Sequence, residues 1–192
     1  MNSNYKVAVV GGGIFGAAAA IEIATLNVDV TIFEREHDLL QAASGINQYR
    51  LHRGYHYPRS TETALSSKEA EPEFASRFSP AIVQGAEHYY AIAAENSKVS
   101  PEQYIKFCQE TNLYHQEVEL PLVSPKVAVT LRAEEYLFDP GTLRQLVHKE
   151  LDNAGVKIKL QTNATKSILN KFDFVVIATY ASSNELVSQL EL

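Results

Sequence analysis

Apolar residues form short unbroken runs near both ends of the chain, and these runs are separated by helical patterns. Residues 7–10 and 174–178 are apolar without alternation, which is typical of parallel strands buried on both faces. A helical pattern at residues 14–26 and a further strand pattern at residues 28–33 follow the first run. Two strands joined by a helix predict a βαβ unit, so the pattern favours an α/β fold with a parallel sheet.

The middle of the chain mixes helical and strand patterns. In chain order they predict a helix at 61–78 that Pro72 splits or kinks, a strand at 87–93, a helix at 101–111 that begins after Ser100, and edge strands of an antiparallel sheet within 117–131, where Pro121 and Pro125 interrupt the alternation. This order of elements predicts an inserted α+β subdomain at residues 61–135, which the family resemblance given below implies to be part of a substrate subdomain.

The pattern then returns to that of the first part of the chain. Residues 139–155 predict a helix that ends near Gly155, residues 156–160 a strand, and residues 167–169 a short strand before 174–178. We therefore expect residues 1–60 and 136–192 to form one Rossmann-like nucleotide-binding domain, with a left-handed cap at Asn27.

A glycine turn joins the first strand to the first helix. Gly11 allows a sharp turn, Gly13 lets a pyrophosphate approach the backbone, and Gly16 lets the helix pack closely on the sheet. The N–H groups at the helix start, with the positive end of the helix dipole, face such an anion. Glu34 ends the second strand, where a carboxylate accepts hydrogen bonds from both ribose hydroxyls. The combination predicts a dinucleotide site rather than an accidental glycine-rich turn.

The composition of the chain argues against some classes of binding partner. The net charge of −6 over 192 residues argues against a nucleic-acid or anionic membrane surface, and we expect a small-molecule substrate. Cys108, the single cysteine, cannot form an internal disulfide, which fits a cytoplasmic location. No membrane span or signal peptide is predicted, and the scattered histidines predict no metal site. The oligomeric state stays open.

Residues 42–58 change from small residues to a run dense in His, Arg and Tyr, which is typical of a site wall. His52 is either a hydrogen-bonded wall histidine or a base beside the reacting group. Arg50 is suited to hold a substrate carboxylate, a cofactor phosphate or an internal acid. Tyr55 and its neighbours Tyr49 and Tyr57 either line a pocket or are ordinary half-buried tyrosines.

The chain resembles the amino-terminal part of the FAD-dependent oxidoreductases related to D-amino-acid oxidase, glycine oxidase and L-2-hydroxyglutarate dehydrogenase. The stretches that carry the resemblance are 7–34, Ala43-Ser44 with Asn47, the run 51–58, which is similar to a His-x-Gly-x-x-Tyr-Pro motif, and 139–156 with 173–179. The resemblance implies FAD as cofactor and His52 and Arg50 as catalytic residues. It implies cofactor contacts from Gly11, Gly13, Ile14, Phe15, Gly16, Glu34, Arg35, Ala43, Ser44, Asn47, Ala178 and Thr179.

The implied reaction is hydride transfer from a small amine or 2-hydroxy acid to flavin N5. His52 would accept the hydroxyl proton of a hydroxy acid, whereas an unprotonated amine needs no base. Two alternatives to an FAD-dependent oxidoreductase stay open: a nicotinamide-dependent NAD(P) dehydrogenase and a non-catalytic dinucleotide-binding fragment.

The chain departs from the family's pattern in three places. Tyr180 stands where the family has glycine, the link between Leu160 and Phe172 is short, and the family continues beyond Leu192. We therefore expect an incomplete enzyme that lacks the carboxyl-terminal part.

Overall fold

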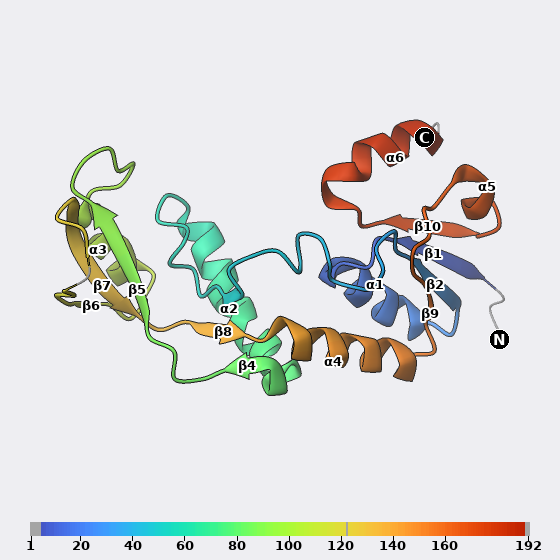
Figure 1. The fold of residues 1–192 in the computed structure, drawn as a ribbon, viewed down its shortest axis with the longest axis horizontal. Helices are drawn as coiled ribbons and strands as arrows, with labels where there is room; N and C mark the ends of the chain where they lie inside the picture. The colour runs from blue at the N-terminus through green and yellow to red at the C-terminus, as the bar shows by residue number, and fades with distance from the viewer. Residues whose placement is uncertain (1–4, 122, 191–192) are drawn as a thin grey trace. The chain divides into compact units, whose positions relative to one another are not determined.

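The computed structural model describes residues 5–121 and 123–190. Their contacts divide the chain into two compact units, the first formed by Met1–Gln48 with Pro140–Leu192 and the second by Tyr49–Asp139 (Figure 1). The second unit starts earlier and ends later than the insertion expected at 61–135. The reason is that β3 (Arg50–Leu51) pairs with β8 (Tyr136–Phe138), which joins both flanking segments to the second unit.

The first unit contains a parallel sheet of four strands. In spatial order these are β10 (Phe174–Ile177), β1 (Lys6–Val10), β2 (Asp29–Phe33) and β9 (Lys157–Lys159). All four were expected near these positions. β1 and β2 are buried along most of their length, as their apolar runs predict, whereas β9 alternates two exposed lysines with Ile158. The predicted α/β class is confirmed.

Helices cover both faces of this sheet. The face of Ala8, Val10 and Phe33 packs against the segment around α5 (Lys166–Leu169) and against Leu186 of α6 (Ser183–Leu190), which follows the short η2 (Tyr180–Ser182). The alternate residues of the strands face the other way. There α1 (Ile14–Ala24) and α4 (Pro140–Asn153) contact each other and bury Ala17, Ala20, Leu143, Val147 and Leu151.

The second unit combines two antiparallel sheets with helices. One sheet has the order β5 (His88–Ala93), β7 (Val127–Ala133) and β6 (Gln116–Glu117), and the other has the order β3, β8 and β4 (Ile82–Val83). The helices are α2 (Thr61–Arg77), the short η1 (Ser79–Ala81) and α3 (Pro101–Glu110). At the start of α3, Ser100 and Gln103 form a capping box and Pro101 occupies the first turn, as the sequence predicts.

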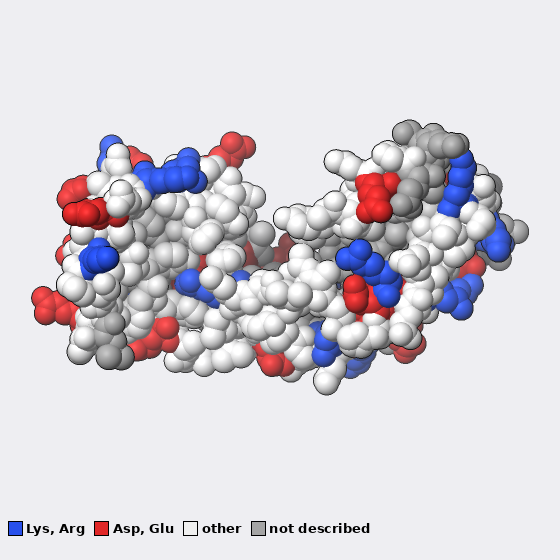
Figure 2. All heavy atoms as spheres, turned by 45° about the horizontal axis from the view of Figure 1, so that its top comes forward, with Lys and Arg blue, Asp and Glu red and all other residues white. Residues whose placement is uncertain are grey.

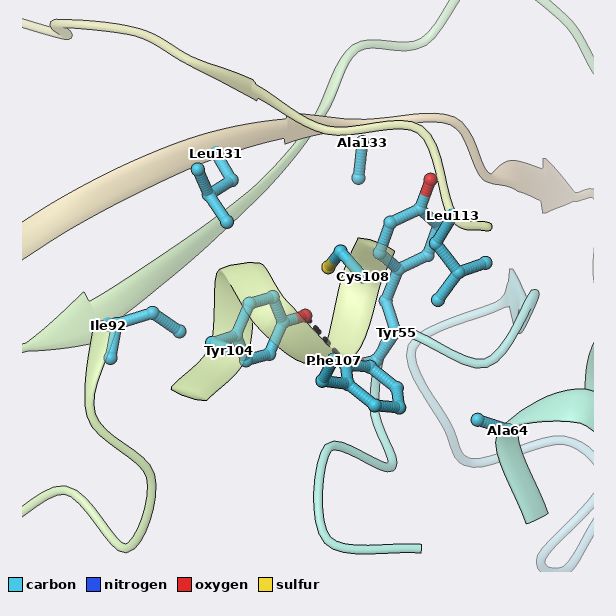
Figure 3. Close-up of a cluster of buried hydrophobic side chains, with 9 residues drawn as sticks. All are labelled: Tyr55, Ala64, Ile92, Tyr104, Phe107, Cys108, Leu113, Leu131 and Ala133. Carbon is cyan, nitrogen blue, oxygen red and sulfur yellow. Dashed lines mark hydrogen bonds between the residues drawn. The ribbon is translucent and has the colours of Figure 1, made fainter. Parts of the chain in front are cut away.

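The core of the second unit lies between α3 and the sheet that contains β7 (Figure 3). Tyr55 enters this core from the loop after β3 and is almost fully buried. Its hydroxyl donates to the carbonyl oxygen of Tyr114, and its own carbonyl accepts a hydrogen bond from the hydroxyl of Tyr104. Tyr55 is therefore a core residue and not part of a site wall.

Three local expectations need correction. Residues 167–169 form the last part of α5 and not a strand, because the backbone N–H of Leu169 bonds the carbonyl of Thr165 and closes a helical turn. β7 is the central strand of its sheet because it pairs with both β5 and β6, and Pro121 and Pro125 lie in the connection before it. Leu122, in the same connection, lies outside the described residues. α2 continues through Pro72, so of the two effects expected of this proline the split is wrong.

Only glycine suits position 54, because of both its backbone conformation and the space around it. Its φ is +108°, and a Cβ atom would lie 2.6 Å from the carbonyl oxygen of Ala64. Gly85 has a φ of +81° but no atom within 4 Å of such a Cβ. Both alanine substitutions place an L-residue at positive φ, but only Gly54→Ala adds a backbone clash. We expect chemical denaturation to show Gly54→Ala less stable than Gly85→Ala by at least ~2 kcal/mol. Equal losses would contradict this.

Candidate functional site

The glycine turn after β1 is held by very close backbone packing. Gly11 has a φ of +107°, and a Cβ there would lie 2.5 Å from the carbonyl oxygen of Ala178, just after β10. A Cβ on Gly16 would lie 1.9 Å from the carbonyl oxygen of Gly11. No side chain fits at either position, so these glycines are needed for the turn itself.

The start of α1 is covered by the loop that follows β2. The N–H of Ile14 donates to the hydroxyl of Ser44 at 3.1 Å, and the side-chain amide of Asn47 donates to the carbonyls of Ala43 and Ser44. A Cβ on Gly13 would meet only the Ser44 oxygen, at 3.3 Å. The helix start therefore has an open side, and a hydroxyl group already lies beside its first N–H.

The carboxylate of Glu34 lies against the glycine turn. One oxygen accepts a hydrogen bond from the N–H of Gly12 at 2.6 Å, and the other accepts from the N–H of Glu36 at 2.9 Å. Arg35 points outward, with a side chain 60% exposed and an ion pair to Glu36. The acid that ends β2 and the turn that ends β1 thus lie next to each other, as a dinucleotide site requires.

The remaining residues predicted to contact the cofactor also lie at the carboxyl end of the sheet. Phe15 is largely exposed at the start of α1. The N–H of Ala178 donates to the carbonyl of Val10, and the Thr179 hydroxyl lies 3.2 Å from that of Ser183. Tyr180, next in the chain, is exposed at a φ of +50°, a conformation that glycine adopts with less strain. All of the predicted cofactor residues belong to the first unit, and their contacts with FAD stay a prediction.

The residues predicted to be catalytic lie in the second unit, around a carboxylate that the sequence did not single out. The side chain of Glu135 is fully buried and accepts hydrogen bonds from the guanidinium of Arg50, the backbone N–H of Arg53 and the hydroxyl of Tyr90. The Arg50 guanidinium also lies over the Tyr90 ring, 4.8 Å from its centroid. Of the three roles left open for Arg50, pairing with an internal acid is the one that the structure contains.

His52 lies at the edge of the same cluster. Its Nδ1 is buried and 3.7 Å from a Glu135 oxygen, while the side chain as a whole is 33% exposed. The ring packs near the ring of His56, at 5.3 Å between centroids. His88, on β5, is 7% exposed and has a buried Nε2 with no protein partner. The proximity of His52 to a flavin stays a prediction.

The net effect of the cluster is to lower the pKa of both Glu135 and His88. Burial alone would raise the pKa of Glu135, but His52, the Arg53 N–H, the Arg50 charge and the Tyr90 hydroxyl together bring it below the ordinary value. Burial and the Arg50 charge lower the pKa of His88. Glu135 is therefore ionised at neutral pH, and His88 is neutral.

Sequence reasoning missed Glu135 because its pattern is ordinary. It follows Glu134 in a two-residue link between β7 and β8, where acids are common and solvated. Only the pairing of β3 with β8 brings it beside Arg50.

The whole described chain fits one known family. The family model for FAD dependent oxidoreductases matches residues 6–191. The chain belongs to this family. The predicted family of FAD-dependent oxidoreductases is therefore confirmed, as is FAD as the cofactor of the family.

Curated relatives share this assignment. The chain is 30% identical over 175 residues to the FAD-dependent monooxygenase kojA of Aspergillus flavus, which covers 85% of the chain and 40% of that protein. It is 31% identical over 100 residues to the FAD-dependent monooxygenase FPY4 of Fusarium mangiferae, covering 52% of the chain and 27% of that protein. The chain thus spans less than half the length of these relatives.

Solved structures show the same fold. Glycine oxidase from Geobacillus kaustophilus matches with a TM-score of 0.70 at 19% identity, covering 98% of this chain and 59% of that one. An L-amino acid deaminase from Proteus vulgaris matches with a TM-score of 0.69 at 17% identity, covering all of this chain and 51% of that one. At these identities the matches show a shared fold alone.

Other site classes have little support among residues 5–121 and 123–190. No three His, Cys, Asp or Glu side chains in this part of the chain are grouped to hold a metal ion. None of its helices has the length and apolar character to cross a bilayer. Acidic and basic side chains are interspersed on the face drawn in Figure 2. The absence of a nucleic-acid partner stays a prediction.

The buried position of Glu135 generates a stability prediction. Glu135→Gln leaves the Arg50 charge without a partner, and we expect a loss of about 3–5 kcal/mol in the free energy of unfolding near neutral pH. Because the folded pKa of Glu135 is lowered, its contribution is complete above the unfolded value of about 4.3. The contribution is lost as the pH falls through the folded pKa, so the two proteins should converge in acid.

The neighbouring Glu134 provides the matched control. Its side chain is 59% exposed and lies 3.5 Å from Arg53, so Glu134→Gln should change the stability by less than about 1 kcal/mol. Urea unfolding across a pH series measures both variants. A Glu135→Gln protein as stable as Glu134→Gln would show that the buried pair contributes nothing.

Proposed function

We propose that this chain is the cofactor-binding and partial substrate-binding part of an FAD-dependent oxidoreductase that oxidises a small amine or 2-hydroxy acid. The observation that supports it most is the position of the Glu34 carboxylate, 2.6 Å from the N–H of Gly12. There the acid that recognises a ribose and the turn that admits a pyrophosphate lie together.

The residues of the first unit fit the ADP half of FAD. The open side of Gly13 leaves space for a pyrophosphate beside the N–H groups of the α1 start, with the Ser44 hydroxyl as a further donor. The ribose hydroxyls would donate to Glu34. When bound, the flavin supplies the hydride-accepting ring, and the protein contributes binding, orientation and proton transfer.

The proposed roles in the second unit follow from its buried cluster. His52 accepts the proton of a substrate hydroxyl through its exposed side. Arg50 stays paired with Glu135, so it contributes by holding this cluster together.

Oxygen transfer is the second candidate reaction, and the printed names of the curated relatives favour it, since both are FAD-dependent monooxygenases. The two reactions differ in the fate of O₂. Turnover under ¹⁸O₂ with the full-length protein separates them: dehydrogenation leaves no label in the organic product, and monooxygenation places one labelled atom there. Labelled product would contradict simple amine or hydroxy-acid oxidation.

The glycine turn generates a binding prediction. Gly13 is the N-cap of α1 and has an extended backbone, so Asp at this position suits the helix and should preserve the fold. Its negative charge would lie where the pyrophosphate binds, and Gly13→Asp should reduce FAD affinity at least ~100-fold, since repulsion and lost space together exceed about 2.7 kcal/mol. Fluorescence titration of the chain with FAD measures this.

Asn96→Asp is the control for charge alone. It makes the same change in net charge at an exposed position of the second unit and should leave the FAD affinity unchanged. Unchanged affinity in Gly13→Asp as well would disprove the placement of the pyrophosphate.

Glu34 generates a prediction on cofactor choice. Glu34→Gln should weaken FAD binding by about 1–3 kcal/mol, because a charged hydrogen-bond acceptor is lost. The wild-type chain should reject NADP, whose 2′-phosphate would meet the carboxylate. Competition of NADP against bound FAD is the measurement, and a preference for NADP would refute the assignment.

A further inference from the structure

We propose that Glu135 is a positioning residue for His52: its carboxylate holds the proton of the imidazole on Nδ1 and leaves Nε2 as the proton acceptor. The inference rests on the proposed function for the use made of Nε2. The orientation itself is a property of the second unit and is tested without cofactor or substrate.

The Glu135 carboxylate is fixed in place by its other partners. The oxygen Oε2 accepts from the Arg50 guanidinium and, at 2.9 Å, from the Tyr90 hydroxyl. Among the described residues, Oε1 accepts one hydrogen bond, from the N–H of Arg53 at 3.1 Å. Because each carboxylate oxygen accepts about two hydrogen bonds, Oε1 keeps capacity for one further donor.

The Nδ1 of His52 is the nitrogen that faces this remaining capacity. It lies 3.7 Å from Oε1 and is buried, with no hydrogen-bond partner in the part of the chain that the structure describes. A buried imidazole nitrogen beside a carboxylate is stabilised as a donor, since a lone pair there would face a negative charge. In a neutral ring this places the lone pair on Nε2, and the carboxylate fixes tautomer and ring orientation together.

Arg50 makes this arrangement possible. A carboxylate with no exposed surface would be costly to ionise, and the paired guanidinium offsets that cost. Arg50 thus stabilises the Glu135 carboxylate, and Glu135 in turn orients His52. Tyr90 from β5 and the backbone of Arg53 complete the support.

The proposal is tested directly by determining the tautomer of His52 by NMR. Long-range ¹H–¹⁵N correlation spectra of the 192-residue chain, labelled on its six histidines, distinguish Nδ1–H from Nε2–H. The spectra are recorded well above the ordinary imidazole pKa of about 6.5, and His52→Gln assigns the His52 signals. We expect His52 as Nδ1–H. Observation of the Nε2–H tautomer would overturn the proposal.

Two other histidines serve as internal references. The Nδ1 of His115 lies 2.9 Å from the carbonyl oxygen of Leu113, which accepts only, so His115 is expected as Nδ1–H. The Nε2 of His148 lies 2.7 Å from the Asp38 carboxylate, so His148 is expected as Nε2–H. The two patterns of cross-peaks calibrate the assignment for His52 within one spectrum.

A double variant tests the cause. Arg50→Met with Glu135→Met removes both charges at similar volume, which is milder than leaving one buried charge unpaired. His52 should lose its Nδ1–H preference, while His115 and His148 keep theirs. Glu134→Gln, the neighbouring acid, should leave all three unchanged. If His52 keeps the Nδ1–H tautomer in the double variant, Glu135 does not position it.

The wild-type spectrum decides the proposal if the double variant fails to fold. Because no cofactor is present, the result is independent of the reaction. A chain that binds no FAD but has His52 as Nδ1–H would refute the proposed function and keep the positioning role. A chain that binds FAD and has His52 as Nε2–H would refute the positioning role and leave the proposed function standing.

Discussion

The first unit depends on one steric constraint, the approach of three backbone segments at the carboxyl end of its sheet. Gly16 brings the first turn of α1 against the carbonyl of Gly11, and Gly11 in turn lies against the carbonyl of Ala178. Any side chain at these glycines would separate the strand, the helix and the end of β10. The same approach leaves the N–H of Gly12 beside the Glu34 carboxylate, so the packing that stabilises the fold also shapes the proposed nucleotide site.

The second unit is organised around a charge rather than a turn. Glu135 connects β3, the segment after it and β5 through one buried carboxylate. A buried ion pair adds little net stability compared with an apolar core, but it fixes the geometry of the groups around it. That property suits the proposed role of the partly exposed His52, which requires a defined orientation of the ring.

Family membership and local geometry agree on the cofactor and differ in what they say of the reaction. The family model and the curated relatives are FAD-dependent by name, and the solved structures show a shared fold. The relatives are named as monooxygenases, whereas the structural neighbours include oxidases and a deaminase. The geometry of the first unit fits the proposed nucleotide site, and the names of these proteins do not agree on one substrate class.

The sequence by itself determined the sheet of the first unit, the glycine turn and the acid that follows β2, because each depends on local patterns: apolar runs, positive φ at glycine and a fixed spacing between turn and acid. Tertiary structure decided what no local pattern encodes. Residues 167–169 are too few for strand and helix periods to differ, and Tyr55 could not be assigned to core or pocket from its type alone. Above all, Glu135 and Arg50 are 85 residues apart in the chain. Only the pairing of β3 with β8 buries them together and turns an ordinary acid into the centre of the second unit.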